Sequence, residues 1–275
     1  MKTVELRGTH QRGRPAVRPA VYLTAVAVVT AVSMGVLNPG TARDLASVVG
    51  FGVCHQLPAH SFAFGGQPFP LCARCTGSFL GFVLGVVSLV ALDRGRWSGL
   101  PTRRLWAPLG AAVALMALDG MNSYLDLVTR GAYHLYAPNN WFRFATGHVY
   151  GTVLALGVVP VFNSALWALD DPRPVLRSGW GLLGILGLAG GSAAGIALGG
   201  NWVEGPLAVA GALGAVGVFA IVNAVAFLMV TGRSQRAKRW RDAATALLVG
   251  VALTAMEIGA LSALRASLGP WLIPT

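Results

Sequence analysis

Long apolar blocks separated by short polar segments dominate the chain. A helix needs about 20 mostly apolar residues to cross the hydrocarbon core of a bilayer. Seven blocks of roughly this length are present, at about 19–37, 76–92, 105–121, 144–162, 179–199, 206–230 and 243–264. The pattern therefore predicts an all-α fold, a polytopic transmembrane helical bundle of about seven spans.

Composition agrees with a membrane protein. Hydrophobic residues make up 55% of the 275 residues and charged residues only 11%, whereas soluble domains carry about 25% charge. The net charge of +11 would suggest a nucleic-acid partner. However, the basic residues lie in short runs between apolar blocks, where membrane topology explains them. We therefore expect the lipid bilayer, and no nucleic acid, as a partner.

The positions of the basic residues predict an orientation. Sixteen of the 21 Lys and Arg residues lie in the N-terminal tail and in the loops that follow the second, fourth and sixth blocks. Because cytoplasmic loops carry the excess of basic residues, the N-terminus is expected in the cytoplasm and the protein in the plasma membrane. An alternative for the first block is a cleaved signal peptide, although its apolar run is longer than usual.

Three regions follow from this organisation. They are a cytoplasmic basic tail (1–18), a membrane core with an extracytoplasmic loop (19–164) and three further helices rich in Gly and Ala (165–275). Small residues recur in these last helices, at Gly191, Gly195, Gly199, Gly211, Gly214 and Gly217. In lipid such residues let helix backbones approach closely, so we expect tight static packing there rather than a moving gate. Asn223 is expected to form a hydrogen bond between helices.

The loop after the first block carries the candidate chemistry. Cys72 and Cys75 are separated by two residues, a spacing at which one turn offers two sulfurs to one metal. With Cys54 and His55 upstream, they form a candidate tetrahedral site for zinc or iron on the extracytoplasmic side. Cys75 is expected at a helix N-terminus with Arg74 between the two thiols, and both features lower a cysteine pKa. The segment about 44–56 has a weak helical pattern, and prolines and glycines then turn the loop back.

The same residues leave alternatives open. A thiol-disulfide oxidoreductase of the cell envelope would cycle Cys72 and Cys75, with Cys54 as a third partner. A structural disulfide and a transporter of a metal ion or small solute are the other hypotheses. Adjacent side chains in an extended segment point to opposite faces, so Cys54 is a stronger ligand candidate than His55. Common hydrolase and nucleotide-binding motifs are absent, so the sequence assigns no enzyme class.

Further polar residues are predicted at the same membrane level. They are Asp119, Asn140, Arg143, His148 and Glu257. Ionisable residues at membrane depth are costly, and they usually form pairs or line a cavity. We expect Arg143 to pair with Asp119 or Glu257, either as support for the site or as a structural lock between helices. Asp119 and His148 also compete with His55 as the fourth ligand.

The segment CHQLPAHSFAFGGQPFPLCARCTGSFLGF (54–82) resembles the signature of an uncharacterised prokaryotic membrane-protein family, domain of unknown function 2085. A second, looser block is similar at Asp119, Gly120, Asn140, Arg143, Thr146 and Gly147. The resemblance covers about residues 48–155. It implies a shared site built from both blocks and brings no known activity. The family usually has Arg where His60 stands, so His60 is a poor ligand candidate by this comparison.

Overall fold

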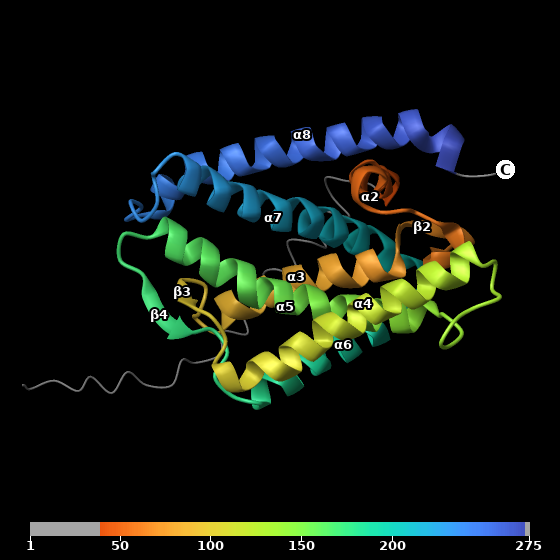
Figure 1. The fold of residues 1–275 in the computed structure, drawn as a ribbon, viewed down its shortest axis with the longest axis horizontal. Helices are drawn as coiled ribbons and strands as arrows, with labels where there is room; N and C mark the ends of the chain where they lie inside the picture. The colour runs from red at the N-terminus through yellow and green to blue at the C-terminus, as the bar shows by residue number, and fades with distance from the viewer. Residues whose placement is uncertain (1–38, 273–275) are drawn as a thin grey trace, which may run out of the picture.

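The computed structural model describes residues 39–272, which are mainly helical (Figure 1). The helices are α2 (Pro39–Val53), α3 (Ala73–Ala91), α4 (Trp106–Val128), α5 (Asn140–Leu166), α6 (Trp180–Gly199), α7 (Glu204–Val230) and α8 (Trp240–Leu272). Short 3₁₀ turns are η2 (Pro58–His60), η3 (Arg103–Leu105) and η4 (Gly200–Val203). A helical membrane protein is thus confirmed in outline, and two small two-stranded sheets are an addition that the sequence did not predict.

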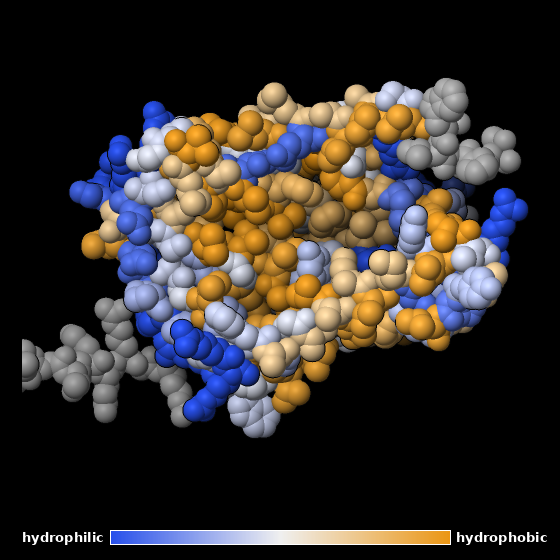
Figure 2. Space-filling model, in the orientation of Figure 1, coloured by the Kyte–Doolittle hydropathy of each residue, from blue (hydrophilic) through white to orange (hydrophobic). Residues whose placement is uncertain are grey.

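Five segments of the described chain are long and apolar enough to cross a membrane. They are Ala73–Ala91, Arg103–Val128, Asn140–Leu166, Trp180–Val230 and Trp240–Leu268. The fourth contains two of the predicted spans, because η4 joins α6 to α7 without a polar loop. The predicted first span, 19–37, lies outside the described residues, so the count of seven and the orientation stay predictions. Apolar side chains cover the middle of one face, and hydrophilic ones gather towards its ends (Figure 2).

The closest helix packing is between α3 and α5. Glycines line the crossing, at Gly77, Gly81, Gly147 and Gly151. A Cβ atom at Gly151 would lie 1.8 Å from the carbonyl oxygen of Ser78, and one at Gly81 would lie 2.1 Å from that of His148. The two backbones are therefore in direct contact, as small residues four apart allow in membrane helices.

The glycine pattern of the C-terminal helices has a mixed outcome. In α6, a Cβ atom at Gly191 or Gly195 would meet nothing within 4 Å, so the prediction of close packing there is wrong. In α7, a Cβ atom at Gly214 would lie 2.4 Å from the carbonyl oxygen of Phe79 in α3, so close packing is confirmed there. Asn223 of α7 donates a hydrogen bond to Thr254 of α8 at 3.1 Å, as expected.

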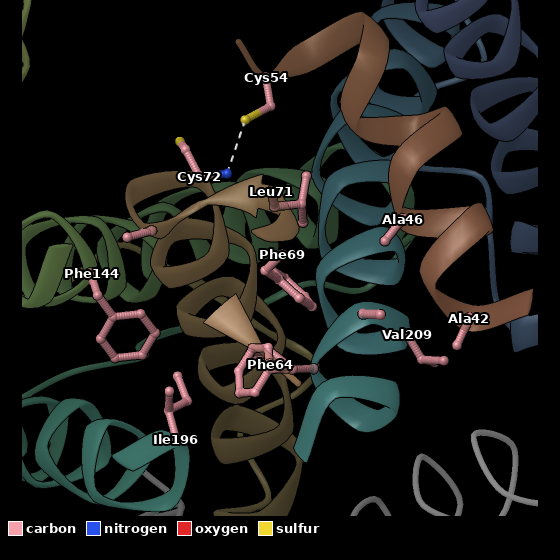
Figure 3. Packing of buried hydrophobic residues seen from close by; sticks show 13 residues of the cluster. Ala42, Ala46, Cys54, Phe64, Phe69, Leu71, Cys72, Phe144, Ile196 and Val209 are labelled. Atoms are coloured by element: carbon pink, nitrogen blue, oxygen red, sulfur yellow. Dashed lines mark hydrogen bonds between the residues drawn. The ribbon is translucent and has the colours of Figure 1, made fainter. Parts of the chain in front are cut away.

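The loop that precedes α3 folds as a hairpin. β1 (Ser61–Phe64) pairs antiparallel with β2 (Gln67–Cys72), and only Gly65 and Gly66 connect them. Both glycines have positive φ, 56° and 78°, which is the backbone that a tight two-residue hairpin turn requires. One face of the hairpin buries Phe64, Phe69 and Leu71 in a cluster with residues of α2, α5 and α7 (Figure 3). The helical pattern near 44–56 corresponds to α2.

The second sheet lies at the opposite end of α3. β3 (Trp97–Gly99) pairs in parallel with β4 (Asp171–Pro174), and Figure 1 shows this pair far from the β1–β2 hairpin along the long axis. With 19 residues and a rise of about 1.5 Å per residue, α3 separates the two ends by roughly 28 Å. The hairpin positions the candidate site at one end of the bundle.

Candidate metal centre

Cys72 ends β2 and is the N-cap residue of α3. Its backbone is extended, and its Sγ accepts a hydrogen bond from the N–H of Cys75 at 3.4 Å. An acceptor at this position satisfies an N–H group that the helix leaves free, and the helix dipole favours an anion there. The prediction that thiols stand at the start of this helix is therefore correct. The capping residue is Cys72, while Cys75 lies within the first turn.

Cys54 approaches from the end of α2. Its Sγ accepts hydrogen bonds from the N–H of Cys72 at 3.3 Å and from the N–H of Gln56 at 3.5 Å. In Figure 3 the sulfurs of Cys54 and Cys72 both point away from the packed Phe and Leu side chains. The ligand atoms of Cys54, His55 and Cys72 all lie within 4.8 Å of one another. The chain turns after α2, so the side chains of the adjacent Cys54 and His55 reach the same site instead of pointing to opposite sides.

Hydrogen bonding distributes the negative charge unequally among the thiols. Hydrogen bonds from the Cys72 and Cys75 side chains lower the pKa of Cys54 to about 2, although burial opposes this shift. The same contact, in which Cys72 donates to Cys54, raises the pKa of Cys72 to about 11. One thiolate is therefore held by neighbouring S–H and N–H donors. Thiolates are the form that binds metals.

Arg74 does not act on the thiols as predicted. Its Nε donates to the carboxylate of Asp119 at 2.9 Å, and its Nη2 donates to Ser123 at 2.8 Å. The Asp119 side chain is fully buried and also accepts a hydrogen bond from the hydroxyl of Tyr136 at 2.7 Å. The positive charge of Arg74 is thus paired with Asp119.

The expected partners of Arg143 are also wrong. Arg143 donates to Asn140 at 2.9 Å and to Ser123 at 3.3 Å. Glu257 instead accepts a hydrogen bond from Asn223 at 2.8 Å. The reason is geometric: Arg74 leaves the first turn of α3 towards α4 and reaches Asp119.

His148 lies apart from the cysteines. It is fully buried, and its Nε2 lies 3.1 Å from the hydroxyl of Ser192 in α6. Asn140 does connect the two sequence blocks, because its amide donates to the carbonyl of Ser61 at 2.9 Å and to that of Ala59 at 3.3 Å. The predicted ligand Cys75 and the competing candidates Asp119 and His148 do not belong to the three-residue ligand group.

Known proteins are similar to this chain over the part that carries these residues. The family model of predicted membrane proteins DUF2085 matches residues 54–156. An uncharacterised protein of Methanothermobacter thermautotrophicus is 52% identical over 105 residues, which are 38% of this chain and 82% of that protein. The chain belongs to the DUF2085 family. An uncharacterised protein of Methanocaldococcus jannaschii is 28% identical over 115 residues, 42% of this chain and 67% of that protein. No solved structure matches the chain.

One histidine that the family resemblance set aside lies beside the site. The Nδ1 of His60 is 3.3 Å from the Nε2 of His55, whose Nδ1 accepts from the N–H of Leu57 at 3.2 Å. Burial lowers the pKa of His60 to about 4, so its ring is neutral at pH 7. Because the Nδ1 of His55 accepts from Leu57, its Nε2 carries the proton and donates to His60, which orients the ring. A metal bound through Nδ1 would replace the contact with the N–H of Leu57. The signal in the sequence is the spacing, because His55 and His60 are five positions apart on either side of Pro58.

A second contact lies outside the part of the chain that the family model matches. Arg265 of α8 donates hydrogen bonds to the carbonyls of Cys54 at 2.6 Å, His55 at 2.9 Å and Phe51 at 2.9 Å. A guanidinium here caps the last carbonyls of α2 and holds the Cys54–His55 turn. No local pattern identifies this role, because Arg265 and Cys54 are more than 200 residues apart.

Proposed function

We propose that this DUF2085 protein is an integral membrane metalloprotein that binds one zinc or iron ion through Cys54, His55, Cys72 and Cys75. The observation that carries the proposal is the convergence of the Cys54, His55 and Cys72 ligand atoms within 4.8 Å. Three sulfurs and one imidazole are a donor set that zinc and iron accept in tetrahedral geometry. Cys75, which lies outside this group, is the proposed fourth ligand, because its side chain is a hydrogen-bond partner of Cys54 and Cys72.

The charge around the sulfurs supports a cation. Among the described residues, the nearby guanidinium of Arg74 is ion-paired with Asp119, and that of Arg265 faces backbone carbonyls. The third nearby guanidinium, Arg143, donates to the neutral side chains of Asn140 and Ser123. A divalent ion would allow Cys72 and Cys75 to ionise beside Cys54, because a bound metal deprotonates the thiols that coordinate it. The N–H donors to Cys54 and Cys72 then stabilise the bound thiolates and orient them.

We infer an extracytoplasmic position for this site, with seven spans and a cytoplasmic N-terminus, from the distribution of Lys and Arg. The exposed Ala132, in the loop between α4 and α5, allows a test. In a cysteine-free background, a new thiol from Ala132→Cys should react with a membrane-impermeant maleimide in intact cells. Labelling only in inverted vesicles would reverse the assignment.

Metal analysis is the decisive experiment. Protein purified in detergent is measured by plasma mass spectrometry, beside a Cys72→Ser/Cys75→Ser variant and a His55→Asn variant. We expect about one equivalent of zinc or iron in the unchanged protein, and its loss in the double variant. His134→Asn is the matched control, because His134 pairs with Asp126 at a partly exposed position and should leave metal content unchanged. An unchanged protein that takes up neither zinc nor ferrous iron would refute the proposal.

The second candidate is a thiol-disulfide oxidoreductase. It is favoured by one observation: all three cysteines are free thiols in mutual contact, and Cys75 is only partly buried. A Cys75→Ser variant should then trap a mixed disulfide, which non-reducing gel electrophoresis would detect. Absence of any trapped species, together with a bound metal, would favour the first proposal. The transporter hypothesis stays a prediction that uptake into vesicles would test.

A further inference from the structure

A cavity of about 470 Å³ lies at the end of the bundle away from the cysteines. Its walls come from α3, α5 and α6, and most are apolar, including Leu89, Leu156 and Ile185. Arg94 and Arg177 also line it, from the loops that follow α3 and β4. Figure 1 shows that these loops lie at the β3–β4 end, where Figure 2 shows hydrophilic side chains gathered. The cavity thus joins a charged rim to the apolar interior of the bundle.

The rim concentrates positive charge around one aromatic ring. The guanidinium carbons of Arg94 and Arg177 lie 5.2 Å and 4.9 Å from the centre of the Trp97 ring. Arg173 stacks on the same ring, and its charge is paired with Asp171. Within residues 39–272, no carboxylate forms an ion pair with Arg94 or Arg177. Two cations therefore share one surface without a bound counter-charge from the described chain.

Arg94 carries a donor that the protein leaves unused. Its Nη1 donates to the carbonyl of Val175 at 2.8 Å, while its Nε is buried and has no hydrogen-bond partner in the described structure. Burial and the nearby charge of Arg177 both lower the pKa of Arg94. A buried donor without a partner costs free energy, and a shift of the guanidinium towards an anionic oxygen at the rim would relieve this cost.

We propose that this cavity binds one anionic phospholipid, with the phosphate at Arg94 and Arg177 and an acyl chain between α3 and α6. The chemistry of the two halves matches that of such a lipid: guanidiniums recognise phosphate, and the apolar walls accept a hydrocarbon chain. Trp180, which is 80% exposed, stands at the rim and suits the headgroup level. A small soluble anion would use only the rim and leave the apolar walls unexplained. The inference is independent of the metal site.

Gly184 provides a steric test of the apolar half. It lines the cavity from α6, and a Cβ atom there would meet nothing within 4 Å. Gly184→Leu should therefore fill part of the cavity without disturbing a helix contact. Gly187 of α6 is equally open but does not line the cavity, so Gly187→Leu is the matched control.

The experiment is native mass spectrometry of the full chain in detergent, after delipidation and addition of phosphatidylglycerol or phosphatidylcholine. We expect one retained phosphatidylglycerol per protein and weak retention of phosphatidylcholine. Arg94→Gln with Arg177→Gln should weaken phosphatidylglycerol binding roughly 25-fold, because each basic side chain contributes about fivefold. Arg103→Gln with Arg104→Gln changes two exposed arginines that do not line the cavity, and should leave binding near that of the unchanged protein.

Four outcomes would overturn the proposal. Equal retention of the two lipids would show that charge does not select the ligand. Unchanged binding in Gly184→Leu, with a melting temperature like that of Gly187→Leu, would show that no acyl chain enters the cavity. Displacement of the bound lipid by millimolar inorganic phosphate alone would identify the rim as a small-anion site. Binding that appears only after removal of residues 1–38 would mean that this segment occupies the cavity instead.

Discussion

The close contact between α3 and α5 predicts that adding a single methyl group at the crossing destabilises the protein. At Gly151 an added Cβ would lie 1.8 Å from the carbonyl oxygen of Ser78. An ordinary contact is about 3.4 Å or more, so the helices must separate by roughly 1.5 Å, and a gap of that size forfeits most of the dispersion energy across it. Overpacking of this kind costs about 1–3 kcal/mol. We therefore expect Gly151→Ala to lower the free energy of unfolding by that amount.

Gly157 supplies a matched control on the same helix. A Cβ atom there would meet nothing within 4 Å, so Gly157→Ala should raise stability by about 0.5–1 kcal/mol through the better helix propensity of alanine. The two substitutions are thus expected to change the free energy of unfolding in opposite directions. Both free energies can be measured by titration with sodium dodecyl sulfate in maltoside micelles, with fluorescence of the eight tryptophans as the signal. Equal stability of the two alanine variants would refute the close crossing.

Three further predictions concern the polar groups near the site. Asp119→Asn should lower the free energy of unfolding by about 3–5 kcal/mol, because it leaves the buried Arg74 charge unpaired; the micelle titration measures this. Burial and its hydrogen bond to Asp119 raise the pKa of Tyr136 to about 12, so its contribution to stability is complete below pH 10 and lost as pH rises to about 12; Tyr136→Phe removes this part. Arg265→Ala should weaken zinc binding about tenfold in a chelator competition assay, since its hydrogen bonds hold the Cys54–His55 turn.

Each of these predictions has a control and a contradicting result. Asp170→Asn changes an exposed carboxylate and should alter stability by less than about 0.5 kcal/mol; an equal effect at Asp119 would deny the buried pair. A difference in stability between the wild-type protein and Tyr136→Phe that stays constant from pH 10 to about 12 would contradict the phenol argument. Arg241→Ala alters an exposed arginine of α8, and an equal loss of zinc affinity in this variant would assign the effect to overall charge.

The sequence predicted the helices well, because apolar blocks of bilayer length have few alternative structures. It also identified the cysteines and the second polar block, which the structure brings together through Asn140 and through the Arg74–Asp119 pair. The choice of ion-pair partners could not be predicted, since it depends on the rotation of α3 relative to α4. Two candidate arginines, Arg74 and Arg143, both reach Ser123 of α4, and only the tertiary arrangement determines which one pairs with Asp119.

The prediction of close packing from glycine spacing was wrong in α6 for a similar reason. The repeat in α6 and the one in α3 have the same period, and a single sequence does not reveal which face meets a neighbouring helix. The contact lies instead where Gly81 and Gly151 face backbone carbonyls. The contact of Arg265 with Cys54 was equally invisible, because it joins residues at opposite ends of the described chain.

The glycine crossing also divides the four proposed ligands into two classes with different freedom. Cys72 and Cys75 belong to the start of α3, whose backbone is pressed against α5 and has little room to shift. Cys54 and His55 lie on a turn that side-chain hydrogen bonds from Arg265 hold. When an ion binds, the loss of conformational entropy would therefore come mainly from ordering the turn rather than the helix. Exchange of the ion would then begin with the release of Cys54 and His55, while Cys72 and Cys75 stay in position to hold the ion with two sulfurs.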